Sequence, residues 1–108
     1  MPSSWKRVNS SQIAFTGELN RDTVPTLWQD CQHWLEGEGD LAIELAQVQL
    51  VDSAGVAMLL QLQRRLQQHQ RQLILLNPNA QLRAIVELSG VSDLVQFEQT
   101  KTEQNSES

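Results

Sequence analysis

A short, uninterrupted apolar run, Leu73-Ile74-Leu75-Leu76, is the feature that most constrains the fold of this chain. The run has the length of a strand, and a strand without polar alternation is typical of a mostly parallel sheet that is covered on both faces. A proline-free stretch of good helix formers, Ala54 to about Gln70, comes just before it. The sequence therefore predicts an α/β fold with this strand near the centre of the sheet.

Strand and helix patterns alternate along the N-terminal half. Trp5 to Val8 and Gln12 to Gly17 are typical of two strands joined by an Asn9-Ser10-Ser11 turn, which predicts a hairpin. A single amphipathic helix is expected next, with Asp22 as its N-cap, Pro25 in its first turn and its end near Gly37. Apolar positions from Leu41 to Val51 then predict a strand that leads to Asp52.

The C-terminal third continues the alternation. Asn77-Pro78 is expected to open a third helix that ends at Gly90, and Leu94 to Phe97 are expected to form an edge strand. The core face of that helix is predicted to hold Leu82, Ile85, Val86 and Leu88. The whole pattern indicates one domain over residues 1–98, a mixed and mostly parallel sheet of four to five strands packed with three or more helices. Residues 99–108 contain no apolar side chain and are predicted to be disordered.

Composition excludes several classes of function. The formal charge of −5 disfavours binding to nucleic acid or to anionic lipid, and no stretch is long and apolar enough to insert into a membrane. One cysteine, Cys31, and two scattered histidines, His33 and His69, predict neither a disulfide nor a metal site. We therefore expect a cytoplasmic chain without cofactors whose partner is another protein. Arg64, Arg65 and Arg71 would suit an acidic patch on that partner.

The segment Asp52-Ser53-Ala54-Gly55 stands where a predicted strand, a short polar turn and a helix start coincide. A serine there can cap the helix, accept a phosphate at the positive end of the helix dipole, or contact a partner. Spacing alone leaves these three roles open. No histidine lies nearby in sequence to serve as a base for Ser53, so we expect no catalytic residue and no enzymatic activity.

The helix after this segment is predicted to have two faces. At 100° per residue, one side groups the apolar Val56, Leu59, Leu62 and Leu66. The other side begins with small residues that would let a partner approach closely. The predicted partner-binding residues are Asp52, Ser53, Ala54, Gly55, Ala57, Gln61 and Arg64. Trp28 and Trp34 are six residues apart and cannot share one narrow stripe, so one is expected in the core and the other partly exposed, as a secondary contact candidate.

Asp52-Ser53-Ala54-Gly55, between Leu41–Leu45 and Val56–Leu60, resembles the hallmark of STAS domains, which occur in anti-sigma factor antagonists and in sulfate transporter tails. The order of elements is similar over about residues 5 to 97. Within that family Thr16-Gly17-Glu18-Leu19 and Leu27-Trp28 look most like the MlaB subgroup. Ser53 and Ala54 stand where that subgroup usually has Thr and Gly, which moves the motif toward the antagonist pattern.

The MlaB resemblance implies a non-catalytic accessory subunit that binds a MlaF-like ATPase of an ABC transporter. With a permease and a membrane-bound substrate-binding subunit, that transporter moves phospholipid between the membranes of Gram-negative bacteria and maintains outer-membrane lipid asymmetry. The chain would then lie at the cytoplasmic face of the inner membrane through its partner. The alternative is an anti-sigma factor antagonist, in which a serine kinase phosphorylates Ser53 and the added charge releases the anti-sigma factor.

Overall fold

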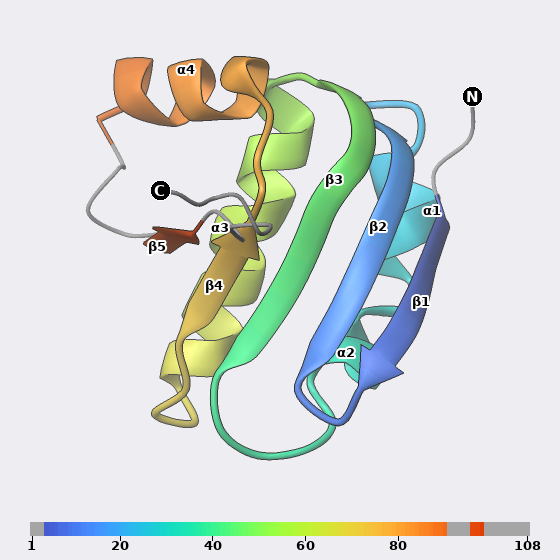
Figure 1. The fold of residues 1–108 in the computed structure, drawn as a ribbon, viewed down its shortest axis with the longest axis vertical. Helices are drawn as coiled ribbons and strands as arrows, with labels where there is room; N and C mark the ends of the chain where they lie inside the picture. Colours follow the sequence, from blue (N-terminus) through green and yellow to red (C-terminus); the bar gives the residue numbers. More distant parts are fainter. Residues whose placement is uncertain (1–3, 91–95, 99–108) are drawn as a thin grey trace, which may run out of the picture.

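The computed structural model describes residues 4–90 and 96–98, which form one sheet with helices packed on it (Figure 1). The strands are β1 (Ser4–Asn9), β2 (Gln12–Leu19), β3 (Leu41–Val51), β4 (Leu73–Leu76) and β5 (Gln96–Glu98). The helices are α1 (Val24–Trp28), α2 (Cys31–Trp34), α3 (Ser53–Gln67) and α4 (Ala80–Leu88). The predicted order of strands and helices is confirmed, apart from the division of the first helix into α1 and α2.

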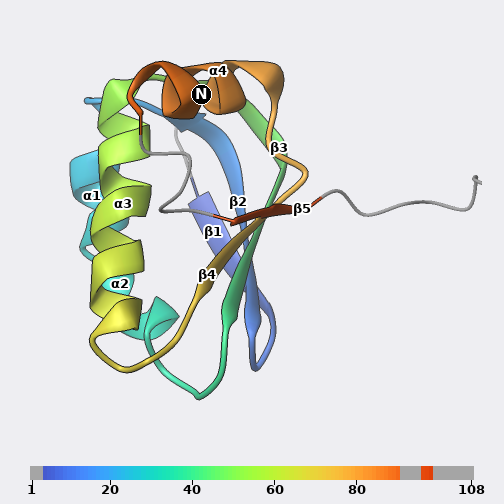
Figure 2. The ribbon, with the colours of Figure 1, turned by 90° about the vertical axis from the view of Figure 1, so that its left-hand side faces the viewer.

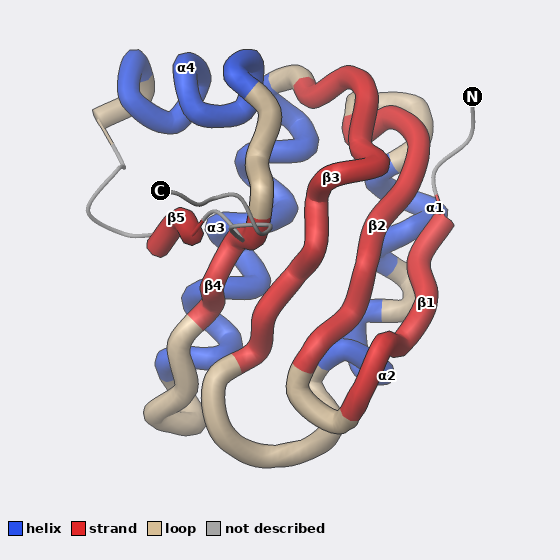
Figure 3. The backbone as a smooth tube through the Cα atoms, in the orientation of Figure 1, coloured by secondary structure: helices blue, strands red, loops and turns tan. Residues whose placement is uncertain are grey.

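The sheet is mixed, as predicted, and its strands follow one another in chain order, β1-β2-β3-β4-β5 (Figure 3). β1 pairs antiparallel with β2, which confirms the N-terminal hairpin, and the other three pairings are parallel. β3 is therefore the central strand. The run Leu73–Leu76 lies near the centre as predicted, because it pairs with β3 on one side and with the short β5 on the other.

The helices α1, α2 and α3 all lie on one side of the sheet (Figure 2). Ile13, Ile43 and Leu75 pair across β2, β3 and β4, and none of the three is exposed to solvent. Ile74 is only half-buried because it alternates to the sheet face away from these helices. The apolar run was thus predicted correctly as a strand. The expectation that it would be buried on both faces holds in part, because Leu76, which alternates to the same face as Ile74, is buried.

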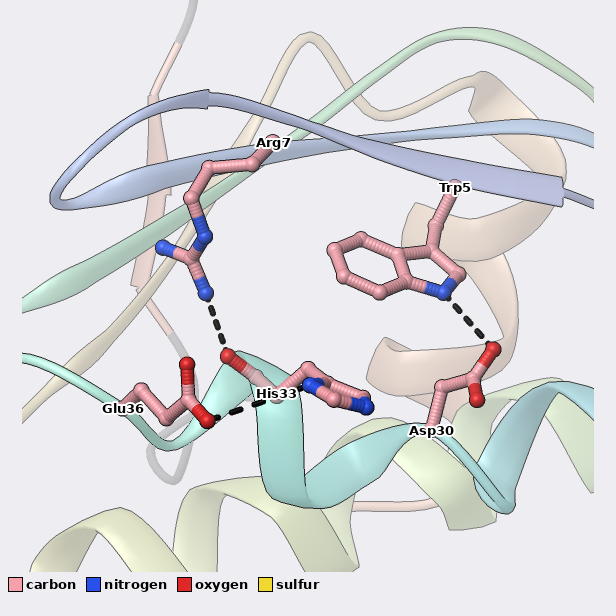
Figure 4. A network of polar contacts seen from close by, with 5 residues as sticks. All are labelled: Trp5, Arg7, Asp30, His33 and Glu36. Atoms are coloured by element: carbon pink, nitrogen blue, oxygen red, sulfur yellow. Dashed lines mark hydrogen bonds and ion pairs between the residues drawn. The ribbon is translucent and has the colours of Figure 1, made fainter.

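The predicted single helix before β3 is broken after Trp28, and a set of contacts holds the second piece against β1 (Figure 4). The Trp5 indole N–H donates to Asp30 Oδ2 over 2.9 Å, at the residue that precedes α2. The Arg7 guanidinium donates to the His33 carbonyl oxygen. These contacts place the exposed His33 over the Trp5 ring, with 6.1 Å between ring centroids.

Trp34 is the aromatic centre of this layer. It is fully buried, and its ring lies 5.1 Å from Phe15 and 6.0 Å from Trp28 between centroids. Trp28 is half-buried, so the expectation of one core and one partly exposed tryptophan is confirmed. The predicted N-cap of the first helix was Asp22, but Thr23 occupies that position; Pro25 lies in the first turn, as expected.

α4 begins after Asn79, whose side-chain oxygen accepts a hydrogen bond from the Leu82 N–H over 2.8 Å. Leu82 and Val86 are buried as predicted, but Leu88 is 88% exposed and does not belong to the core face. Gly90 follows the helix with a φ of 72°, which agrees with the predicted helix end. Leu94 and Val95 of the predicted edge strand, and the predicted disordered tail 99–108, lie outside the described residues.

Arg71, which follows α3, is not available to a partner. Its side chain is only 8% exposed, and its Nε and Nη1 donate to the carbonyl oxygens of Gly39 and Leu35 over 2.6 and 2.7 Å. The proposal that it would meet an acidic patch is therefore wrong. Arg71 instead fixes the loop that precedes β3, where the Asp40 carboxylate also accepts a hydrogen bond from the Gln72 N–H over 3.1 Å.

Candidate functional site

The start of α3 lies at the carboxyl end of the central strand (Figure 1). The Asp52 N–H donates to the Leu19 carbonyl oxygen over 3.0 Å, which ties the turn to β2. Asp52 Oδ1 accepts hydrogen bonds from the N–H groups of Ala54 and Gly55, over 2.8 and 3.3 Å. Asp52 is therefore the N-cap of α3, which excludes the first of the three roles that the sequence left open for Ser53.

Ser53 is the first residue of α3, and its side chain is exposed. Within residues 4–90 and 96–98, no group forms a hydrogen bond with its hydroxyl. The cap is already supplied by Asp52, so the hydroxyl is not needed to begin the helix. It stands beside the N–H groups of the first turn, where the helix dipole favours negative charge. Of the roles that the sequence left open, phosphoacceptor and contact residue remain.

Gly55, one of the predicted contact residues, is buried in the described part of the chain. A Cβ at this position would lie 2.7 Å from the Leu19 carbonyl oxygen and 2.8 Å from the Leu19 Cβ. Only glycine allows α3 to approach β2 this closely. The residue serves the site indirectly, because this close packing is what holds Asp52 and Ser53 at the end of the sheet.

An open pocket lies between α1 and α3, and its lining on α3 begins at Ala54, the residue after Ser53. Its volume is about 270 Å³. Three predicted residues, Ala54, Ala57 and Gln61, line one side of it. The structure adds Val24 and Trp28 from α1, and Met58 from α3. The predicted face of α3 is therefore one wall of an apolar hollow.

The two arginines of α3 differ in their relation to this pocket. Arg64, a predicted contact, is exposed but does not line the hollow. The Arg65 guanidinium carbon lies 5.4 Å from the centroid of the Trp28 ring, which is itself part of the lining. The spacing of Gln61 and Arg65, four residues apart on one helix, was the signal that could have placed Arg65 on the same face. Val24 and Met58 carried no signal in sequence beyond their apolar character.

Two further observations concern chemistry at the site. Among the described residues, no group of three or more His, Cys, Asp or Glu side chains is placed to hold a metal ion. The same residues include no helix with the length and apolar character that a membrane crossing requires. The carboxylate nearest to Ser53 in sequence, Asp52, bonds to backbone N–H groups.

A comparison with protein families agrees with this geometry. A family model described as "Mlab, STAS domain" matches residues 5–96, which is most of the chain. The chain belongs to the STAS domain family. The predicted family is thereby confirmed, and the segment that suggested it, Asp52-Ser53-Ala54-Gly55, lies at the turn from β3 into α3 of this STAS domain.

The chain is also similar to curated relatives and to solved structures. The anti-sigma-B factor antagonists of Listeria monocytogenes and Listeria innocua are each 28% identical over 94 residues, 86% of this chain and 82% of theirs. The unphosphorylated form of the anti-sigma factor antagonist SpoIIAA has a TM-score of 0.71 at 21% identity, over 94% of this chain and 90% of that chain. An anti-sigma factor antagonist described as putative, from Thermotoga maritima, has a TM-score of 0.74 at 16% identity, over 92% and 86%. These structures share the fold.

Proposed function

We propose that this STAS domain is a non-catalytic protein-binding module that docks a partner through the start of α3, and that charge on Ser53 controls the docking. One observation carries the proposal: Ser53 is exposed, its hydroxyl bonds no described residue, and the next residue, Ala54, lines an apolar pocket. A serine that served only to begin the helix would bond its backbone. Asp52 has that role here, which leaves Ser53 for another molecule.

The partner class that we propose first is the anti-sigma factor and its serine kinase. Both curated relatives are named as anti-sigma-B factor antagonists, and the Bacillus protein SpoIIAA has been solved in a phosphorylated form, with a TM-score of 0.69 to this chain. Phosphorylation of Ser53 would add about two negative charges beside Asp52. The helix dipole would favour the new charge within the chain, but an apolar or acidic partner surface would be repelled.

A second candidate is an accessory subunit of a phospholipid-transport ABC system, bound to its ATPase. The description of the matching family as "Mlab, STAS domain" favours it, together with the resemblance of Thr16–Leu19 to that subgroup. In this case Ser53 would belong to a standing interface and need not be phosphorylated. The chain would act at the cytoplasmic face of the inner membrane through the ATPase. In the first case it would exchange partners in the cytoplasm.

Affinity purification from the native organism tests the proposal. The tagged chain would be expressed in wild-type form and as Ser53→Asp and Ser53→Ala variants, and captured proteins would be identified by mass spectrometry. We expect the wild type and Ser53→Ala to capture the same partner and Ser53→Asp to lose it, because only the last adds charge. Intact-mass analysis of the purified wild type would show whether a phosphate is present.

The identity of the captured protein separates the two candidates. An anti-sigma factor or serine kinase would support the antagonist, whereas an ABC ATPase recovered with its permease would support the transporter subunit. Undiminished capture by Ser53→Asp would overturn the role given to Ser53. Turnover of a small-molecule substrate at this site would overturn the non-catalytic part of the proposal.

A further inference from the structure

The pocket between α1 and α3, whose lining on α3 begins at Ala54, has a volume that suits one side chain. Its volume of about 270 Å³ lies below the range of roughly 300–1,000 Å³ that is usual for small-molecule sites. Five of its six lining residues are apolar, and the sixth, Gln61, is exposed. Such a lining favours the burial of one apolar side chain of the size of leucine or phenylalanine.

A cation lies at the rim of this pocket. The Arg65 guanidinium stacks at 5.4 Å over Trp28, so its stem and charge border the apolar lining. α3 carries no acidic residue anywhere from Ser53 to Gln67, although the chain as a whole has a formal charge of −5. In the part of the chain that the structure describes, neither Arg64 nor Arg65 forms an ion pair. The surface that continues from the pocket along α3 is therefore basic and uncompensated.

The spacing of these features along α3 suits a second helix laid beside it. Ala57, in the pocket wall, and Arg64 are seven residues apart, which is two turns and about 11 Å along the axis. A partner helix with an apolar residue on one turn and a carboxylate two turns away would match both features. The small side chains of Ala54 and Ala57 leave room for such a helix to approach.

We propose that the pocket takes an apolar side chain from an amphipathic, acidic helix of the partner protein, whose carboxylates contact Arg65 and Arg64. This inference rests on the proposed function and specifies the chemistry of the partner. It adds two requirements to the Ser53 contact. The partner helix must place an apolar side chain in the pocket and carry a carboxylate about two turns away. Helix-in-groove recognition of this kind reads side chains at helical spacing.

Photocrosslinking in the native organism would identify what occupies the pocket. A diazirine-bearing leucine analogue would replace Gln61, which lines the pocket and is exposed. The control would carry the same analogue in place of Ala84, an exposed residue of α4. We expect position 61, and not position 84, to crosslink to a segment of the captured partner that has an apolar residue with Asp or Glu about two turns away.

Charge reversal tests the second requirement. Arg65→Glu is expected to weaken capture of the partner by about tenfold or more, and replacement of the crosslinked partner's acidic residue by lysine should restore it. Arg83→Glu is the matched control, because Arg83 is also exposed and also stacks on a ring, at 5.6 Å from the Phe97 centroid. That variant should change capture by no more than about twofold.

Each remaining outcome counts against this inference. Crosslinking of position 61 to a second copy of this chain, to a lipid, or to a segment without acidic residues would overturn it. Unchanged capture by Arg65→Glu would also overturn it. If Ser53→Asp still abolished capture in either case, the proposed function would stand and only the pocket inference would fail. If Ser53→Asp captured the partner as well as wild type, or wild type captured none, the proposed function would fail first.

Discussion

At the first turn of α3 the Ser53 hydroxyl points outward and bonds no described residue, whereas just beyond the last turn the Arg71 guanidinium is buried and donates to two backbone carbonyl oxygens. α3 separates these ends by the height of the sheet (Figure 2). A polar side chain that has its partners within the chain stabilises the fold. One that has none is available to another molecule. Substitutions at the two ends should therefore affect different measurements.

The largest effect on stability is expected from Arg71→Ala. The change removes two hydrogen bonds from a buried charged donor and leaves the carbonyl oxygens of Leu35 and Gly39 without them. We expect the free energy of unfolding, measured by urea denaturation, to fall by about 3 kcal/mol. Arg64→Ala, at an exposed position of α3, is the control and should change it by less than about 0.5 kcal/mol. Equal effects of the two changes would break the comparison, because Arg71 would then behave as a surface residue.

Gly55→Ala should have the next largest effect. In an open helix this change stabilises by up to about 1 kcal/mol, since alanine is the better helix former. Here the added Cβ would meet the Leu19 carbonyl oxygen at 2.7 Å, so α3 would have to move away from β2. We expect a loss of about 2 kcal/mol and a lower melting temperature. The sign of the change is decisive: a stabilised variant would show that the packing under the site is loose.

Asp52→Ala should cost about 1 kcal/mol, because the carboxylate caps α3. Asp52→Asn is the control, since asparagine is an equally good cap but carries no charge. If both variants lost the same stability, the effect would come from the charge rather than from the cap. In the affinity purification, Asp52→Asn would also report whether the carboxylate contributes to partner binding beyond its role in beginning the helix.

The sequence predicted the order of strands and helices better than it predicted which faces are covered and where a helix is interrupted. The run Leu73–Leu76 identified a strand, but it could not show that α1, α2 and α3 all lie on one side of the sheet (Figure 2). All four residues of the run are apolar, although Ile74 is only half-buried whereas Leu76 is buried. The break between α1 and α2 depends on contacts from β1, such as Trp5 with Asp30, which lie 25 residues apart in the chain. Helical periodicity contains no information about such distant partners.

The candidate site shows the same limit. Ala54, Ala57 and Gln61 were predicted together from helical spacing, and they do line one pocket. The opposite wall comes from α1, so the sequence could show that a face existed without showing that it was hollow. Ser53 was a credible N-cap by residue type, but the neighbouring Asp52 holds the helix N–H groups instead. Two adjacent capping residues cannot be ranked without the backbone path.

The smallest effect on stability, and the sharpest test of the comparison, is expected from Ser53. Ser53→Ala removes a hydroxyl that bonds no described residue, so the free energy of unfolding should change by less than about 0.5 kcal/mol. Ser53→Asp places a negative charge at the first position of α3, where the helix dipole would stabilise it by about 0.3–1 kcal/mol. That variant should therefore melt at or slightly above the wild-type temperature in differential scanning calorimetry.

A Ser53→Asp variant that is fully folded but captures no partner would separate binding from stability at this end of α3, in contrast to Arg71→Ala at the other. A large drop in its melting temperature would mean that Ser53 supports the fold, and a lost interaction could then be explained by unfolding alone. The Ser53→Ala variant decides between loss of the hydroxyl and gain of charge. If alanine also lost the partner while keeping its melting temperature, the hydroxyl itself would be the contact, and a standing interface would be favoured over a switch driven by phosphate.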